Sequence, residues 1–519
     1  MLAKKLAFGL LAVLSYAPAL MLTEKAAAQD VLPRGVPEKE GVSSTSIMDF
    51  VDAAGHSHTE FHSFMYLRHG KVIAEGWWNP YSPGLRHTLY STSKSFTAAA
   101  VGFALAEKKL KLTDKVISFF PNEVPSPLPP HLADLTVKDV LIMSDGMDPE
   151  PTHNVVVDSN WARAFFATPI LNVPGTKFLY NSAGTYMLSA IVTKVTGQKV
   201  IDYLQPRLFG PLGIDGADWE VSPQGINTGG WGLRLKTEDM AKFGQLYLQG
   251  GRWKGKQLLP VEWVKEATTM QILQDPDASQ AKRDSSDWLQ GYCYQMWRCR
   301  HNGVRADGAF GQFIIMLPDQ DAVIAIQAET PNMQEEINLV WQYLLPGMQG
   351  RACKDDPDDD AKLKTQLAAL ALPPRKGASS SADFPINGRT YMLQDNPKKM
   401  QSIGFALQEG GIWQITLKDD KGTYTLPFGD GKWMRTETPR SGPSLLTGAQ
   451  SHDLGLPPFQ TAGSFQWIDE KTLELVLRYI EGPHTERMVC HFDGNNIRVE
   501  DTNSFEYGKG GTILTGMSQ

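Results

Sequence analysis

The sequence predicts an α/β protein of the α+β type. We expect an antiparallel sheet flanked by helices, a helical subdomain, and then a small all-β barrel or sandwich domain. Strand patterns lie at both ends of residues 36–348 with helical patterns between them, and after Phe384 the pattern changes to short alternating strands. With 519 residues and 42% hydrophobic content, the chain can bury more than one core. Two folded units are therefore expected.

The first unit begins and ends with a hairpin pattern. Residues 64–78 hold two apolar runs that meet at His69-Gly70-Lys71, and residues 313–326 hold two buried runs around Pro318-Asp319-Gln320-Asp321. Pairing of the first and last segments would close the sheet. Helices are predicted between them over residues 96–109, 137–143, 186–195 and 238–248, the last with Thr237 as its N-terminal cap.

Four segments follow from composition. Residues 1–28 form a predicted signal peptide, in which Lys4 and Lys5 precede an apolar run over residues 6–22 and small residues at 26–28. A membrane anchor is the alternative, which Pro18 and the polar residues after the run disfavour. Residues 29–350 form the α/β unit, residues 351–383 an acidic and serine-rich linker, and residues 384–519 the all-β domain. The signal predicts export to the periplasm or extracellular space, with no stable membrane insertion after its removal.

Charge and cysteine content narrow the partners. The net charge of −7, without any lysine- or arginine-rich stretch, disfavours nucleic acid and anionic membranes, so a small-molecule or peptide-like substrate is expected. Export permits disulfides, and the four cysteines allow three pairings or buried thiols. We expect no metal and no cofactor: no C-x-x-C pair is present, and the H-x-H-x-x-x-H pattern of His56, His58 and His62 has no further ligand cluster nearby.

A serine and a lysine three residues apart carry the strongest chemical prediction. The chain has no G-x-S-x-G motif, but Ser91 and Lys94 precede a run over residues 96–105 that is apolar almost all round, which indicates a buried helix. Residues three apart share a helix face, and burial lowers a lysine pKa towards values useful for proton abstraction. Ser91 is therefore predicted as a nucleophile that Lys94 activates. An ordinary exposed lysine is the alternative that S-x-x-K alone leaves open.

Two later segments supply candidate partners. Tyr180 lies in the turn before a helical pattern, where its phenol would pass a proton to the leaving group, with its pKa held down by Lys94. A core tyrosine is the alternative. Residues 305–312 are rich in glycine and lead into a strand, so the amides of Ala309 and Ser91 are predicted to form an oxyanion hole.

Taken together, residues 36–348 resemble the serine β-lactamase and penicillin-binding protein superfamily, in the branch of class C β-lactamases, DD-peptidases, carboxylesterases and 6-aminohexanoate-dimer hydrolases. Ser91 and Lys94 match S-x-x-K, Tyr180 begins the Y-x-N motif, and residues 306–309 match the K-T-G or H-x-G strand. The resemblance implies a β-lactamase-like fold and an acyl-enzyme mechanism. It also implies a set of residues at the oxyanion hole or substrate: Asn181, Ser182, Asp307, Gly308 and Ala309.

Two departures from the family pattern bear on the substrate. Ser182 stands where the lactamase motif has asparagine, and Ala306 stands where it has lysine or histidine, a residue that usually holds a substrate carboxylate. They favour an esterase- or amidase-like serine hydrolase. A DD-peptidase or β-lactamase is the alternative within enzymes, and a non-catalytic penicillin-recognising module is the alternative of another class. The all-β domain shows no constellation with predicted chemistry.

Overall fold

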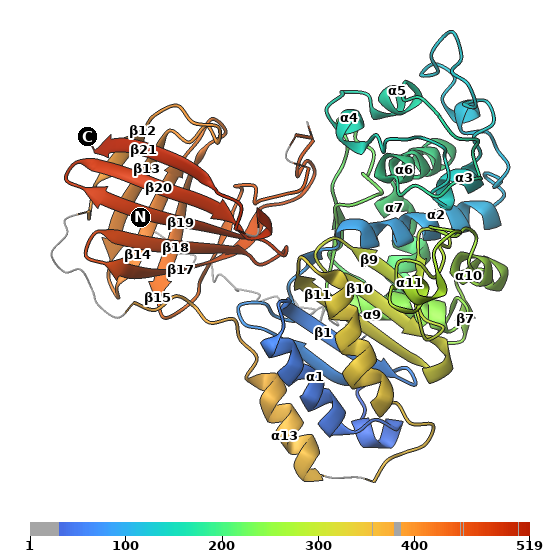
Figure 1. The fold of residues 1–519 in the computed structure, drawn as a ribbon, viewed down its shortest axis with the longest axis horizontal. Coiled ribbons are helices and arrows are strands. Elements are labelled where there is room, and N and C mark those ends of the chain that lie inside the picture. Colours follow the sequence, from blue (N-terminus) through green and yellow to red (C-terminus); the bar gives the residue numbers. More distant parts are fainter. Residues whose placement is uncertain are drawn as a thin grey trace, which may run out of the picture.

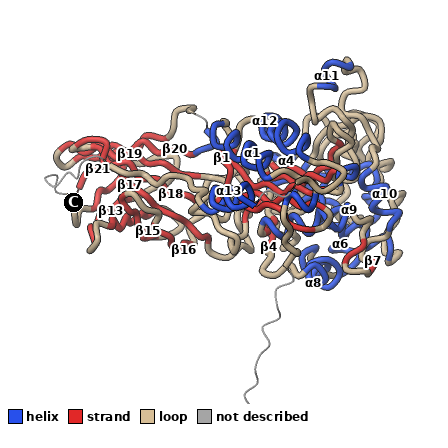
Figure 2. Tube along the Cα trace, turned by 90° about the horizontal axis from the view of Figure 1, so that it is seen from below, coloured by secondary structure: helices blue, strands red, loops and turns tan. Residues whose placement is uncertain are grey.

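The computed structural model describes residues 31–354, 357–377, 386–446, 448–449, 451–506 and 508–518. The predicted signal peptide lies outside these residues. A mixed α/β unit and a β-barrel lie side by side and give an elongated molecule (Figures 1 and 2). Both predicted fold classes are confirmed, and the second unit is a barrel rather than a sandwich.

The α/β unit is built on a six-stranded sheet in the order β2-β1-β11-β10-β9-β8. The first and last long strands of the unit pair antiparallel, with Phe64 opposite Ile326, which confirms the predicted closure. Both predicted hairpins are also present. The strands are β1 (Glu60–Arg68), β2 (Lys71–Trp77), β8 (Trp297–Arg298), β9 (Val304–Gly308), β10 (Gln312–Leu317) and β11 (Ala322–Glu329).

Short strands complete the unit in two small sheets. One sheet has the order β3-β5-β4, and the other is a hairpin of β6 and β7. These strands are β3 (His87–Thr88), β4 (Asp218–Trp219), β5 (Leu233–Leu235), β6 (Arg252–Trp253) and β7 (Lys256–Gln257).

Both faces of the large sheet are buried because its side chains alternate between two cores. Met65 and Leu67 face a core that includes α2, α6 and α9, whereas Phe64 and Tyr66 face a core that includes α1 and α12. This explains why the strands read as continuous apolar runs.

Thirteen α-helices are assigned in the described residues: α1 (Ser44–His56), α2 (Ser93–Ala106), α3 (Val137–Leu141), α4 (Thr152–Val156), α5 (Trp161–Phe166), α6 (Ser182–Thr196), α7 (Val200–Leu204), α8 (Gly210–Leu212), α9 (Thr237–Leu248), α10 (Val261–Thr268), α11 (Gln280–Asp284), α12 (Met333–Leu339) and α13 (Pro357–Ala368). All four predicted helices exist. The predicted cap of α9 is wrong by one residue: Lys236 is the N-cap, and the Thr237 hydroxyl bonds Gln327 Oε1 at 3.0 Å.

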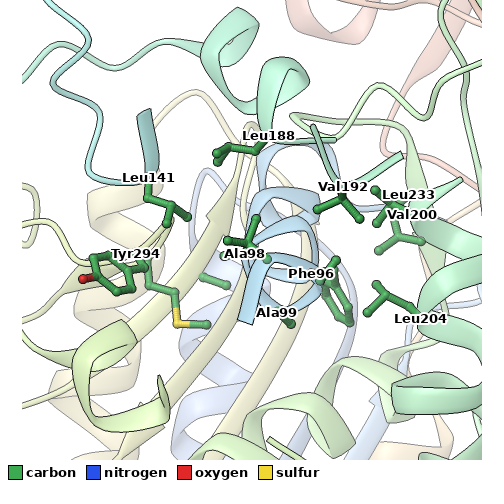
Figure 3. Close-up of a cluster of buried hydrophobic side chains, with 14 of the residues drawn as sticks. Phe96, Ala98, Ala99, Leu141, Leu188, Val192, Val200, Leu204, Leu233 and Tyr294 are labelled. Carbon is green, nitrogen blue, oxygen red and sulfur yellow. The ribbon is translucent and has the colours of Figure 1, made fainter. Parts of the chain in front are cut away.

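Helix α2 passes through the centre of the larger core. Phe96, Ala98 and Ala99 of α2 lie among Leu188 and Val192 of α6 and several other apolar side chains (Figure 3). Every residue from Ser93 to Ala104 is buried. This confirms that the run after Lys94 forms a buried helix, and it fixes the position of the turn that precedes the helix.

The C-terminal unit is a closed barrel of nine strands. Parallel pairing of β15 with β17 closes it, and β16 pairs with β17 outside the ring. The strands are β12 (Thr390–Leu393), β13 (Ser402–Gln408), β14 (Ile412–Lys418), β15 (Thr423–Asp430), β16 (Met434–Thr438), β17 (Phe459–Asp469), β18 (Thr472–Tyr479), β19 (Thr485–Asp493), β20 (Asn496–Asn503) and β21 (Thr512–Ser518).

The segment predicted as a linker includes a helix. Its described part contains α13, which packs against α1 and β2 and buries Leu363. Aspartates at 358–360 begin this helix, where negative charge is favourable.

The four cysteines are free thiols. Among the helices that the structure describes, none has the length and apolarity needed to cross a membrane.

Buried ion pairs join the barrel to the α/β unit. Glu481, in the β18–β19 turn, contacts Arg86 at 2.9 Å and Arg234 at 3.4 Å, and its side chain is 4% exposed. Arg234 also contacts Asp218 at 2.7 Å. The two units therefore form a close interface, although they have separate apolar cores.

Candidate active site

Ser91 lies in a tight turn directly before α2. Residues 90–92 form a 3-10 turn, and the backbone continues into α2 at Ser93. The Thr92 hydroxyl donates to the Gln312 carbonyl at 2.8 Å, and the Leu89 amide donates to the Leu233 carbonyl at 2.9 Å. These bonds tie the turn to β10 and β5, so the position of Ser91 is set on both sides.

Lys94 lies on the first turn of α2 with its amine directed at Ser91. Its Nζ lies 2.9 Å from Ser91 Oγ, 3.0 Å from Ser182 Oγ and 2.7 Å from the Gly230 carbonyl. A neutral amine has two N–H donors and one lone pair. It can therefore donate to Ser182 and Gly230 while accepting the proton of Ser91.

The environment of Lys94 favours that neutral form. Burial lowers its pKa to about 7, against the opposing effects of the Glu150 and Asp307 carboxylates. The residue is 1% exposed. The predicted contact and the predicted lowering of the pKa are both present, which disfavours the alternative of an ordinary surface lysine.

Tyr180 lies close to this pair but differs from the prediction in its acidity. The Lys94 amine lies 4.8 Å from the centroid of the Tyr180 ring, and Trp297 stacks on that ring. Burial, with a further contribution from Asp307, raises the pKa of Tyr180, while a hydrogen bond with Ser91 acts in the opposite direction. The prediction of a lowered pKa is wrong, because desolvation of the phenol dominates. Tyr180 is thus a protonated hydrogen-bond donor.

The end of β9 lies against the Ser91 turn. A Cβ atom on Gly308 would lie 2.1 Å from the Leu89 carbonyl oxygen, so only glycine permits this approach. Ala309 follows and shares a pocket with Ser91. Asp307 is buried and pairs with Arg305 at 2.9 Å, and burial raises its pKa. The Asp307 charge acts on the pKa of Lys94, which it raises. Asp307 is not among the residues that line the pocket.

Asn181 and Ser182 have different roles. The Asn181 side chain caps α6 by accepting from the Gly184 amide, and its Nδ2 donates to Asp145 Oδ2 at 2.7 Å. It is fully buried, so the predicted contact with substrate is replaced by a supporting role. Ser182 lines the pocket and contacts Lys94, in the position where the family motif has asparagine.

A pocket of about 240 Å³ opens beside Ser91. The α/β unit contributes Ser182, Gly230 and Ala309 to its lining, and the barrel unit contributes Ser444, Leu445 and Leu446 from the segment between β16 and β17. Sequence reasoning missed the barrel residues, since no motif marks them. It also missed Glu150, which accepts from the Ser182 amide at 3.0 Å.

The three histidines with a metal-like spacing have separate partners. His56 Nδ1 bonds the Asp52 carbonyl, His58 pairs with Glu335, and His62 Nδ1 lies 3.1 Å from His87 Nε2. In the described part of the chain, no three potential metal ligands are gathered at one place.

The beta-lactamase family model matches residues 57–344, which is more than half of the chain. The chain belongs to the beta-lactamase family. Membership of this family, together with the hydrolases among its relatives, identifies the protein as a serine hydrolase. A 6-aminohexanoate-dimer hydrolase of Paenarthrobacter ureafaciens is 27% identical over 289 residues, covering 52% of this chain and 73% of that protein.

More distant relatives agree with this assignment. A beta-lactamase of Escherichia coli (strain K12) is 22% identical, over 50% of this chain and 81% of its own length. Among solved structures, a Bacillus anthracis protein provisionally assigned as a 6-aminohexanoate-dimer hydrolase has a TM-score of 0.50 and 18% identity. It covers 62% of this chain and 89% of its own. At 18% identity, this structural likeness shows that the two proteins share a fold.

Proposed function

We propose that this hydrolase cleaves an ester or amide through an acyl-enzyme formed on Ser91. The observation that carries the proposal is the 2.9 Å contact between Ser91 Oγ and a buried Lys94 amine whose pKa is about 7. Ser91 attacks the carbonyl while its proton moves to Lys94. Water then attacks the acyl-enzyme and releases the acid.

Tyr180 and two backbone amides complete the proposed mechanism. The raised pKa keeps the Tyr180 phenol protonated, so it donates a hydrogen bond to the leaving group and is reprotonated from Lys94 as the proton departs. The amides of Ser91 and Ala309 bind the developing oxyanion. Their shared pocket and the close approach of Gly308 to Leu89 support this role.

The pocket favours an uncharged, partly apolar substrate over a β-lactam or a cell-wall peptide. Ala306 offers no cation for a substrate carboxylate, and the nearby Arg305 is fully buried in its pair with Asp307. Leu445 and Leu446 add apolar surface.

We also propose export, on the pattern of residues 1–28; a mature protein that begins near residue 29 would support it.

A fluorophosphonate probe followed by intact mass measurement tests the nucleophile. The wild-type protein should gain one adduct, Ser91→Ala should gain none, and Ser95→Ala should label like wild type, because the Ser95 hydroxyl bonds the Gln295 carbonyl on another side of α2. An adduct on Ser91→Ala would refute the assignment.

Rates with three substrates then test the substrate class. We expect p-nitrophenyl esters to be hydrolysed faster than nitrocefin or a peptide ending in D-Ala-D-Ala. A preference for either of the latter two would replace the esterase or amidase proposal with the β-lactamase or DD-peptidase alternative.

A further inference from the structure

Two aromatic residues with unusual backbone conformation flank the proposed oxyanion hole. Tyr90 precedes Ser91 and has φ 46°, and Phe310 follows Ala309 and has φ 68°. Non-glycine residues in this left-handed region are strained and persist only where their surroundings hold them. Tyr90 shares a peptide unit with the Ser91 amide, and Phe310 anchors the chain directly after Ala309, so the geometry of the hole depends on what holds these two residues.

A single side chain of the barrel contacts both. His484, at the base of β19, lies with its Nε2 2.5 Å from the Tyr90 hydroxyl. The rings of His484 and Phe310 meet edge to face at 4.7 Å between centroids, and Tyr90 packs on Phe310 at 5.3 Å. Phe505, also from the barrel, packs on the rings of His484 and Phe310, with centroid distances of 4.7 Å and 5.7 Å.

His484 is itself held by the α/β unit. Its Nδ1 lies 2.7 Å from Glu329 Oε1 at the end of β11, and the Ser504 hydroxyl donates to the same oxygen at 2.6 Å. Burial, together with the Glu329 charge, raises the pKa of Tyr90, which keeps its phenol protonated. The Tyr90 hydroxyl, the His484 ring and the Glu329 carboxylate thus form one continuous hydrogen-bonded chain from the Ser91 turn to the end of β11.

We propose that His484 is a positioning residue that makes the barrel a structural part of the oxyanion hole. It holds Tyr90 by a hydrogen bond and Phe310 by ring packing, and thereby sets the directions of the Ser91 and Ala309 amides. This inference rests on the proposed function. It assigns the barrel a role in the chemical step, in addition to its place in the pocket wall.

The first test is His484→Ala in the full-length protein. A displacement of the amides by a fraction of an ångström weakens their bonds in the transition state more than substrate binding. We expect kcat for a p-nitrophenyl ester to fall about 10- to 100-fold and KM to change less than about 3-fold. His491→Ala is the matched control, because His491 lies on β19, the strand that His484 directly precedes, and pairs with Glu500 on the barrel surface. It should behave like wild type.

A second measurement separates positioning from general loss of structure. A thionoester places sulfur, a weaker and larger acceptor, where the ester has its carbonyl oxygen. An intact oxyanion hole therefore strongly prefers the ester. We expect the ester-to-thionoester ratio of kcat/KM to fall in His484→Ala, by a factor similar to the fall in kcat. Equal losses on both substrates, or wild-type rates, would overturn the proposal.

Tyr90→Phe covers the case in which His484→Ala does not fold. It keeps the ring and removes only the hydroxyl that bonds His484, so a smaller fall in kcat, about 3- to 10-fold, is expected with the same change in the ratio. If wild type labels at Ser91 and both ratios stay at the wild-type value, the positioning role fails and the proposed function stands. If wild type does not label, the proposed function fails and this inference fails with it.

Discussion

The two walls of the active-site pocket are built in different ways. On the α/β side, Ser91, Ser182 and Gly230 are joined through the Lys94 amine by hydrogen bonds of 2.7–3.0 Å. On the barrel side, Leu445 and Leu446 lie in an irregular segment, and Leu445 is 43% exposed. The first wall has a fixed polar geometry suited to chemistry. The second is apolar and can change without disturbing that geometry, so it is suited to substrate choice.

Replacing the lysine should give the largest effect. Lys94→Met removes the proposed base and keeps a side chain of similar length that is compatible with burial. We expect kcat/KM for the preferred ester to fall about 10³-fold, within the range of general-base contributions. Circular dichroism should match wild type. A variant that keeps more than a tenth of the activity would show that the polar wall does not carry the chemistry.

Acid should slow the enzyme through the same group. Lys94 acts as a base only when neutral, and its pKa is about 7. The reactive fraction therefore falls as the pH falls below 7, and kcat/KM should drop about tenfold for each pH unit, or about 100-fold at pH 5. Steady-state rates from pH 5 to 9 measure this. A Leu445→Ala variant should have the same profile, because the apolar wall does not titrate. A flat profile would contradict the role of Lys94.

Breaking the domain interface should cost stability more than chemistry. Glu481→Gln removes the carboxylate that pairs with Arg86 and Arg234 and leaves both arginines their contacts with Asp218. We expect the free energy of unfolding to fall by about 2 kcal/mol, measured in urea. Glu500→Gln, on an exposed pair with Arg498, should change it by less than about 1 kcal/mol. Equal effects would show that the buried interface pairs stabilise the fold no more than an exposed surface pair does.

Changing the apolar wall should give the smallest effect. Leu445→Ala widens the pocket without touching Ser91 or Lys94. We expect the ratio of kcat/KM for a hexanoyl ester over an acetyl ester to change about 3- to 10-fold, as one or two methylenes typically do, with the acetyl ester unaffected. An equal change for both esters would show that Leu445 affects the chemical step and not the choice of acyl chain.

The same contrast explains what could be predicted from the sequence. Ser91 and Lys94 are three residues apart on one helix, so their contact follows from helix geometry. The two hairpins and their pairing follow from apolar runs at the ends of the unit. His484 and Tyr90 are 394 positions apart, and nothing in a single sequence relates them. The barrel's contribution to the site was therefore missed.

Errors within the motifs have local physical causes. The charge of Lys94 alone predicts a lowered pKa for Tyr180, whereas desolvation raises the pKa of a phenol buried against Trp297 and Tyr292. The motif alone predicts that Asn181 contacts the substrate. Its neighbour Asp145 lies 36 positions earlier in the chain, so the bond that occupies its side chain could not be foreseen.

The bridge between Val42 and Met348 brings the beginning and the end of the α/β unit together, beside the β1–β11 pairing. Topologically, the unit is a closed loop before the chain departs through α13. A gene fusion at this point adds a new domain without rethreading any strand of the old one. Any influence of the barrel on the site must therefore pass through side-chain contacts at its surface, such as that of His484 with Tyr90, and not through shared backbone.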